Sequence, residues 1–312
     1  MSGIGHSEGG PERFSEFKPY DSSVFTPIFT QELKESVVPP FLSGIDLSNA
    51  TPQDIINHIN GLLESEKPNA EELAQGLAQL RGENSQLLYS PSDIATILHG
   101  TGTTNANDIA QALFSVENSQ GETFFGAMAI ATALASVKDA EGNSVFDAQA
   151  ITDALVSLKR SDGQNVFSNE DIVRAVSCLV NDGYSSVDVI KALASPNTFE
   201  GLDLSASSLG DLFSNSNFSA EELAAGFKQA GVSAVDTADA LEQMGFSANE
   251  IAVSMKEAGF NAFEIALGLK EAGFNGEDTK GALKEAGFSW LESKSAMRNA
   301  GFEVRPLFFG GA

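Results

Sequence analysis

Apolar and polar residues recur along most of this chain in one short pattern. In the C-terminal third, a glycine followed by phenylalanine or valine recurs every 14 residues, with pairs beginning at Gly231, Gly245, Gly259, Gly273, Gly287 and Gly301. We number each unit from its leading aromatic or apolar residue, as position 0. Upstream the pattern continues with longer spacers, and Phe125, Phe146 and Phe167 lead units that are 21 residues apart. A recurring unit of this kind is the signature of a repeat protein.

Two positions of the unit form its apolar face. Position 5 is apolar, or a small hydroxyl residue, in Ile55, Leu73, Ile94, Ile109, Ile130, Ile151, Ile172, Val189, Leu209, Leu223, Thr237, Ile251, Ile265, Thr279 and Ser293. Position 9 is always apolar, in Ile59, Leu77, Leu98, Leu113, Leu134, Leu155, Val176, Leu193, Phe213, Phe227, Leu241, Met255, Leu269, Leu283 and Met297. Residues four apart share one side of an α-helix, so each unit is predicted to be a short amphipathic helix.

The units also carry the residues that start and stop helices. Position 1 is an N-cap residue in Thr51, Asn69, Ser90, Asn105, Asp147, Ser168, Ser185, Ser205, Ser219, Ser233, Ser247, Asn261, Asn275 and Ser289. Position 4 is a carboxylate in Asp54, Glu72, Asp93, Asp108, Asp171, Asp188, Glu222, Asp236, Glu250, Glu264, Asp278 and Glu292. This is the spacing of a capping box. The glycine before each C-terminal leading residue is predicted to end the preceding helix at C′ with a positive φ.

Helices this short cannot bury their apolar faces alone, so neighbouring units must stack. The sequence therefore predicts an all-α fold, an α-solenoid of short tandem helices. Units of 21 residues with inserted loops occur in residues 46–203, and regular 14-residue units fill residues 204–303. The fold resembles the superhelices of tetratricopeptide and HEAT repeats, although the unit matches neither motif. The alanine-rich units led by Phe125 and Phe146 are expected in the middle of the array. Thr237, Thr279 and Ser293 are expected to face solvent towards its C-terminal end.

The flanking segments are aromatic but irregular. Residues 1–45 are expected to form an N-terminal arm, and residues 304–312 an apolar C-terminal tail. The arm folds over the first helices of its own chain or docks on a neighbouring subunit, and the tail caps the array or inserts into another molecule. Apolar segments at both ends favour end-to-end assembly. The candidate interaction residues are Phe14, Phe17, Phe25, Phe29, Phe308 and Phe309.

The inserted loops are rich in Asp, Asn and Gly. Insertions in repeats commonly mark a binding edge, although this composition also suits plain turns. If successive helices alternate in direction, loops 117–122 and 161–165 share one edge and loop 139–144 lies at the other. Each of these loops has at most two carboxylates, which disfavours a calcium site, and we expect no bound metal.

Composition and charge limit the range of functions and cellular locations to be considered. A net charge of −25 argues against direct binding of nucleic acid or of an anionic membrane. The single cysteine, Cys178, excludes intramolecular disulfides. No segment approaches the length of an apolar membrane span, and the N-terminus lacks the pattern of a Sec signal peptide. We therefore expect a soluble protein that is cytoplasmic, virion-associated or secreted by another route.

No catalytic pattern stands out in the sequence. The three histidines, His6, His58 and His99, are scattered, and helix-terminal or surface roles are expected for the last two. The glycines at 100 and 102 lack the lysine of a phosphate-binding loop. We therefore expect no enzymatic activity and no cofactor. The leading hypothesis is a structural or adaptor protein whose repeat surface and apolar ends bind protein partners, including copies of itself. The alternative is an acidic inhibitor that mimics nucleic acid in a basic protein cleft.

Overall fold

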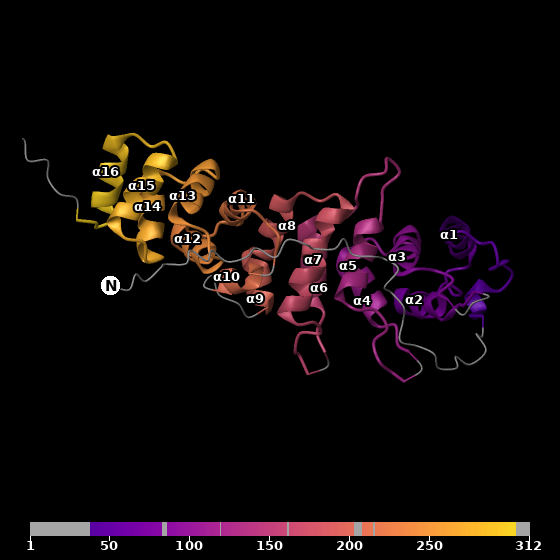
Figure 1. Cartoon of the computed structure of the whole chain (residues 1–312). Helices are drawn as coiled ribbons and strands as arrows, with labels where there is room; N and C mark the ends of the chain where they lie inside the picture. The colour runs from indigo at the N-terminus through magenta and orange to yellow at the C-terminus, as the bar shows by residue number, and fades with distance from the viewer. Residues whose placement is uncertain are drawn as a thin grey trace, which may run out of the picture. The chain divides into compact units, whose positions relative to one another are not determined.

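The repeat folds as a series of short α-helices (Figure 1). The computed structural model describes residues 38–82, 86–118, 120–160, 162–202, 208–214 and 216–303, all of which belong to the unit Ser36–Ala312. The α-helices are α1 (Pro52–Gly61), α2 (Ala70–Gln79), α3 (Pro91–Gly100), α4 (Ala106–Phe114), α5 (Ala127–Ser136), α6 (Ala148–Ser157), α7 (Asn169–Ser177), α8 (Ser186–Leu193), α9 (Pro196–Leu202), α10 (Leu209–Phe213), α11 (Ala220–Ala230), α12 (Ala234–Gln243), α13 (Ala248–Glu257), α14 (Ala262–Glu271), α15 (Gly276–Glu285) and α16 (Trp290–Asn299). Two 3-10 helices, η2 (Pro40–Leu42) and η3 (Cys178–Asp182), accompany them. The described residues contain only isolated β-bridges and no strand, which confirms the predicted all-α fold.

The helices begin with the predicted caps. A position-1 side chain accepts a hydrogen bond from the backbone N–H of position 4 in most units, and seven of the described helices form complete capping boxes: α1, α2, α3, α11, α13, α14 and α16. Aspartate closes the box as well as glutamate, since Asp54 accepts the Thr51 N–H at 2.9 Å. Hydrogen bonds from the Thr51 side chain and backbone hold the pKa of the Asp54 carboxyl below its ordinary value. Three described α-helices lack a side-chain cap hydrogen bond: Gly126 has no side chain to offer α5, and neither Ser185 at α8 nor Ser208 at α10 accepts one.

The C-terminal units end on left-handed glycines, as predicted. The φ angles lie between 77° and 92° at Gly231, Gly245, Gly259, Gly273, Gly287 and Gly301. After α13, the Gly259 N–H donates to the Lys256 carbonyl at 2.9 Å, and the Phe260 N–H donates to the Met255 carbonyl at 3.0 Å. These are the two hydrogen bonds of a Schellman motif. The leading aromatic is thereby fixed to the helix it follows.

Most helices pack on the helix two units away, so alternate helices form two rows, which is the predicted solenoid arrangement. The first row contains α1, α3, α5, α7, α10, α12, α14 and α16, and the second contains α2, α4, α6, α8, α11, α13 and α15. Tyrosines at position 0 connect units within a row. The Tyr89 hydroxyl donates to the Ala50 carbonyl at 3.0 Å, and the Tyr184 hydroxyl donates to the Phe146 carbonyl at 2.7 Å. Each acceptor leads the unit two before its donor.

Small residues allow close packing within a row, where position 8 of one helix faces position 6 of the helix two units earlier. A Cβ added at Gly268 in α14 would lie 2.7 Å from the Ala234 carbonyl oxygen and 2.9 Å from the Ala238 Cβ in α12. Position 8 is correspondingly small in Gly76, Ala112, Ala133, Ala154, Ala175, Ala192, Gly226, Ala240, Ser254, Gly268, Ala282 and Ala296. Position 6 is small in Ala74, Ala95, Ala110, Ala131, Gly210, Ala224, Ala238, Ala252 and Ala266.

The core is continuous along the array. All residues at positions 5 and 9 are buried, which confirms the predicted apolar face. The expectation that the hydroxyl residues at position 5 face solvent is wrong: Thr237 and Thr279 are 0% exposed and Ser293 is 6% exposed. Position 5 lies between the two rows, so neighbouring helices cover it even near the end of the array. The hydroxyls of Thr237 and Thr279 have no hydrogen-bond partner among the described residues.

The two ends of the array are closed in different ways. At the N-terminal end, Phe41 and Pro39 lie against Gly76, at position 8 of α2, and the Phe41 carbonyl is 3.0 Å from the His58 Nε2. The described part of the predicted arm, from Val38 onwards, therefore contacts the first two helices of its own chain.

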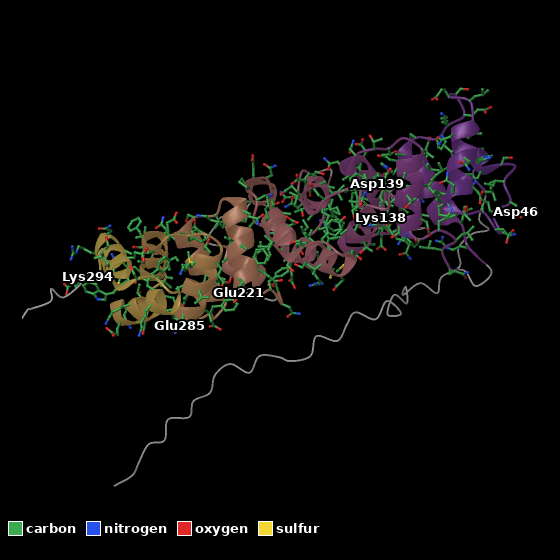
Figure 2. The ribbon with its side chains drawn as sticks, turned by 90° about the horizontal axis from the view of Figure 1, so that it is seen from above. Asp46, Lys138, Asp139, Glu221, Glu285 and Lys294 are labelled. Carbon is green, nitrogen blue, oxygen red and sulfur yellow. The ribbon has the colours of Figure 1, made fainter. Side chains whose placement is uncertain are left out.

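At the C-terminal end, position 6 changes from alanine to lysine in the last helix of each row, at Lys280 and Lys294. Their side chains occupy the face on which a further helix of the row would pack. Figure 2 shows Lys294 at the end of the ribbon.

One stretch departs from the predicted register. Helix α9 corresponds to no predicted unit and packs on α6 and α8. Helix α10 is a short helix, Leu209–Phe213, although both of these end residues are buried at positions 5 and 9 as predicted. Its expected cap, Ser205, lies outside the described residues.

The inserted loops lie where the alternation of helices predicts. Figure 1 shows the α4–α5 and α6–α7 loops at one edge of the array, and the α5–α6 loop at the other. In each loop one isolated antiparallel bridge pairs the two ends, such as Lys138 with Ser144 and Lys159 with Asn165. The bridges show that the insertions are short hairpin turns.

Candidate interaction surface

The interaction residues predicted from the sequence all fall in the two terminal segments. Phe14, Phe17, Phe25, Phe29, Phe308 and Phe309 lie outside the described residues. The candidate surface of the described array comes instead from position 3, near the start of each helix. In the last three helices of the first row this position is apolar, at Val235 in α12, Phe263 in α14 and Leu291 in α16. We call these three residues, together with Trp290, the apolar row face.

The apolar row face is exposed to solvent. Phe263 is 41% exposed, Leu291 70% and Trp290 59%, and Val235 is half-buried. Helices α14 and α16 are in contact, and the Lys270 Nζ in α14 donates to the Ala300 carbonyl beyond the end of α16 at 2.8 Å. Equivalent residues on packed neighbouring helices lie about 8–10 Å apart, so the side chains form one patch.

The last helix extends this patch. Trp290 replaces the alanine that α12 and α14 carry at position 2, and the Lys294 Nζ lies 4.6 Å from the centroid of its ring. A cation at this distance is attracted to the ring face and orients the indole. The patch therefore ends at an aromatic side chain beside a positive charge.

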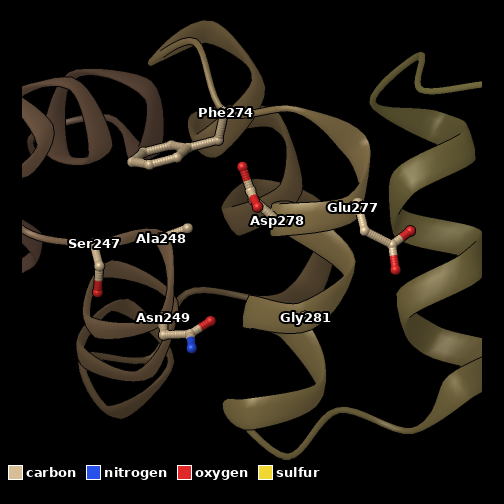
Figure 3. A pocket seen from close by; sticks show the side chains of 7 residues that line it. All are labelled: Ser247, Ala248, Asn249, Phe274, Glu277, Asp278 and Gly281. Carbon is tan, nitrogen blue, oxygen red and sulfur yellow. The ribbon is translucent and has the colours of Figure 1, made fainter. Parts of the chain in front are cut away.

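The last three helices of the second row are polar at the same position. Their position-3 residues are Glu221, Asn249 and Glu277. A groove of about 450 Å³ lies between α13 and α15. Figure 3 shows Asn249 on one side and Asp278 on the other, with Phe274 above and Glu277 directed away. In the C-terminal part of the array, the two rows thus present chemically different surfaces.

Charged side chains cover much of the remaining surface. Figure 2 shows Asp46, Asp139, Glu221 and Glu285 at separate places along the ribbon. Several lysines are occupied internally. The Lys228 Nζ lies 3.9 Å from the centroid of the Phe260 ring and 3.9 Å from the Glu264 carboxylate. The position-4 carboxylates Asp236, Glu264 and Glu292 directly follow the row-face residues in sequence, so negative charge borders this face beside the positive Lys294.

Two titratable side chains of the described array, Cys178 and His99, are half-buried. Burial raises the pKa of the Cys178 thiol, which disfavours a thiolate nucleophile. His99, expected in a helix-terminal or surface role, lies in the last turn of α3 and is half-buried, with its ring 6.0 Å from that of Phe146. Within the described ranges, no group of three or more His, Cys, Asp and Glu side chains is placed to hold a metal ion. No helix of the described chain has both the length and the apolar character needed to cross a membrane.

Comparisons with known proteins leave the surface to be interpreted from its own chemistry. No protein-family model matches the sequence. No curated protein matches it significantly.

A signal for the apolar row face is present in the sequence, but at a period of two units. Position 3 alternates between polar and apolar from Glu221 to Leu291. The alternation acquires meaning only when alternate units are known to share a row. No single unit contains this signal.

Proposed function

We propose that this chain is a non-enzymatic adaptor whose helical repeats bind a protein partner through the apolar row face. The observation that carries this proposal is the exposure of Phe263 and Leu291 at equivalent positions of contacting helices. An exposed apolar patch bordered by polar residues is typical of protein interaction sites. The surrounding carboxylates favour a partner whose apolar contact residues are flanked by lysine or arginine.

The proposal is tested with the double substitution Phe263→Ser and Leu291→Ser. Full-length wild-type protein and this variant are immobilised, and proteins captured from the native source are compared by quantitative mass spectrometry. A matched control carries Asn249→Ser and Glu277→Ser at the same position of the second row. We expect at least one protein to bind wild type and control, and to lose at least about tenfold in affinity for the row-face variant.

Equal capture by all three proteins would contradict the proposal. Capture of only basic nucleic-acid-binding proteins that are released by competing DNA would favour the acidic inhibitor instead. Melting curves of the variants show whether any loss of binding arises from unfolding.

A further inference from the structure

A second candidate site lies in the middle of the array, far along the chain from the apolar row face. A recess of about 610 Å³ opens between the α4–α5 loop and the α6–α7 loop. Its apolar wall includes Phe114, Phe125 and Phe167. The rings of Phe114 and Phe167 meet edge to face with centroids 6.2 Å apart, and Phe125 is buried. The wall is therefore a packed aromatic surface that can accept an apolar side chain.

Two cations border the recess. Lys159 and Arg160 are adjacent in sequence and both are exposed. The Lys159 Nζ donates to the Gly201 carbonyl at 3.1 Å, and the Arg160 Nη2 donates to the Val166 carbonyl at 3.3 Å. In the described part of the chain, neither cation forms an ion pair with a carboxylate. In a protein of net charge −25, two adjacent bases that form no ion pair with the described carboxylates leave positive charge available to a ligand.

The hydrogen bonds of the α6–α7 turn do not explain why residue 160 is an arginine. The equivalent residues of the two preceding loops are Asn118 and Asp139, and each accepts two backbone hydrogen bonds that hold its loop. The Asp139 Oδ1, for example, accepts the N–H groups of Glu141 and Asn143 at 3.0 and 2.8 Å. Arg160 cannot accept such bonds, since a guanidinium has no acceptor. In the α6–α7 loop the Asp162 Oδ1 instead accepts the Gln164 N–H at 2.9 Å. Residue 160 is therefore released from this role, and its arginine places a positive charge at the mouth of the recess.

The start of α5 adds to the positive potential. Gly126, its N-cap, lines the recess, and the helix has neither a capping side chain nor an acidic residue in its first turn. The first N–H groups of a helix carry a partial positive charge when no side chain satisfies them. This charge reinforces the two cations on the same recess.

We propose that this recess binds a short acidic peptide segment of a protein partner. One apolar side chain of the segment packs on Phe114, Phe125 and Phe167, and neighbouring carboxylates pair with Lys159 and Arg160. Long polyanions such as nucleic acid are disfavoured, because only two cations face them on a strongly acidic protein. The site involves α4 to α7 and does not depend on the apolar row face.

The test uses fluorescence anisotropy with full-length protein and labelled hexapeptides, in which two Asp or Glu residues and one Phe or Leu occupy every relative position. We expect saturable binding of at least one peptide. Replacing its acids by Asn or Gln, or its apolar residue by Ala, should raise the dissociation constant about tenfold. Arg160→Asp should do the same. This variant introduces the residue that the neighbouring loop carries at its own equivalent position, so the turn is expected to fold.

Two control variants show whether the peptide binds at this recess or elsewhere on the chain. Lys138→Gln removes the equivalent of Lys159 at the opposite edge and should leave peptide binding unchanged, as should the Phe263→Ser and Leu291→Ser variant. The proposal is overturned if no peptide of the set binds, or if Arg160→Asp binds as tightly as wild type. It is also overturned if inorganic phosphate or oligothymidylate displaces the peptide at equal concentration, since that result identifies a general anion site.

Discussion

Single residues decide where each helix of this array stops. Gly259 adopts a φ of 92°, and a Cβ added there would meet no atom within 4 Å. Glycine is therefore required at position 259 only by the backbone conformation. A side chain has room there, but the left-handed φ disfavours any residue with a Cβ. Gly281 provides the contrast. It has equally open surroundings but lies within helix α15, at a negative φ.

We expect Gly259→Val to lower the free energy of unfolding by more than about 1 kcal/mol, since a β-branched residue is strained in this region. Gly281→Val introduces the same side chain at an open helical site, and should change the free energy of unfolding by less than about 0.5 kcal/mol. Urea unfolding monitored by circular dichroism measures both values. Wild-type stability of Gly259→Val would contradict the C′ assignment.

At the scale of the element, residues within one unit determine where its helix forms. Residues of the neighbouring helices determine how closely the helices pack. Capping residues and the paired apolar positions 5 and 9 act within one unit, and their effects appear as predicted in almost every helix. The small residues at positions 6 and 8 act between units, and the importance of Gly268 appears only when α12 lies against it. Likewise, the missing side-chain cap of α5 can contribute to ligand binding only because Lys159 and Arg160, in the α6–α7 loop, line the same recess.

We expect Gly268→Ala to destabilise the array by about 1–3 kcal/mol. The added methyl would meet the Ala234 backbone at 2.7 Å and force α12 and α14 apart. Gly281→Ala is the matched control, and it should raise stability by up to about 1 kcal/mol through helix propensity alone. Thermal melts of the two variants, compared with wild type, are expected to shift in opposite directions. A stabilised Gly268→Ala protein would show that the two helices are not tightly packed.

At the scale of the whole array, the ends determine whether stacking continues. Helices α11 to α14 carry alanine at position 6, whereas the last two helices carry Lys280 and Lys294. A lysine cannot lose its hydration at such a contact without a large cost in free energy. A further helix of either row is therefore disfavoured at this end, as expected of a capping repeat. The end-to-end assembly through the terminal segments stays a prediction, because those segments lie outside the described residues.

Replacing both lysines by alanine should expose a small-residue face and promote self-association. We expect the double variant Lys280→Ala and Lys294→Ala to show a larger weight-average mass than wild type at equal concentration, in size-exclusion chromatography with light scattering. Lys284→Ala removes a nearby charge outside position 6 and serves as the control. Equal masses for all three proteins would show that these lysines do not limit stacking.

The sequence by itself determined the helical unit, its caps, its terminating glycines and its buried positions 5 and 9. These features depend on residues no more than about six apart, so the period of the pattern contains them. It also indicated, through the alternation of helices, which loops share an edge. Only the tertiary structure decided which units pack together. That choice depends on contacts between residues 28 or more positions apart, such as Lys270 with Ala300. It buries the hydroxyls of Thr237 and Thr279, brings Phe263 beside Leu291, and places Arg160 and Gly126 on one recess, because surfaces form between helices rather than within them.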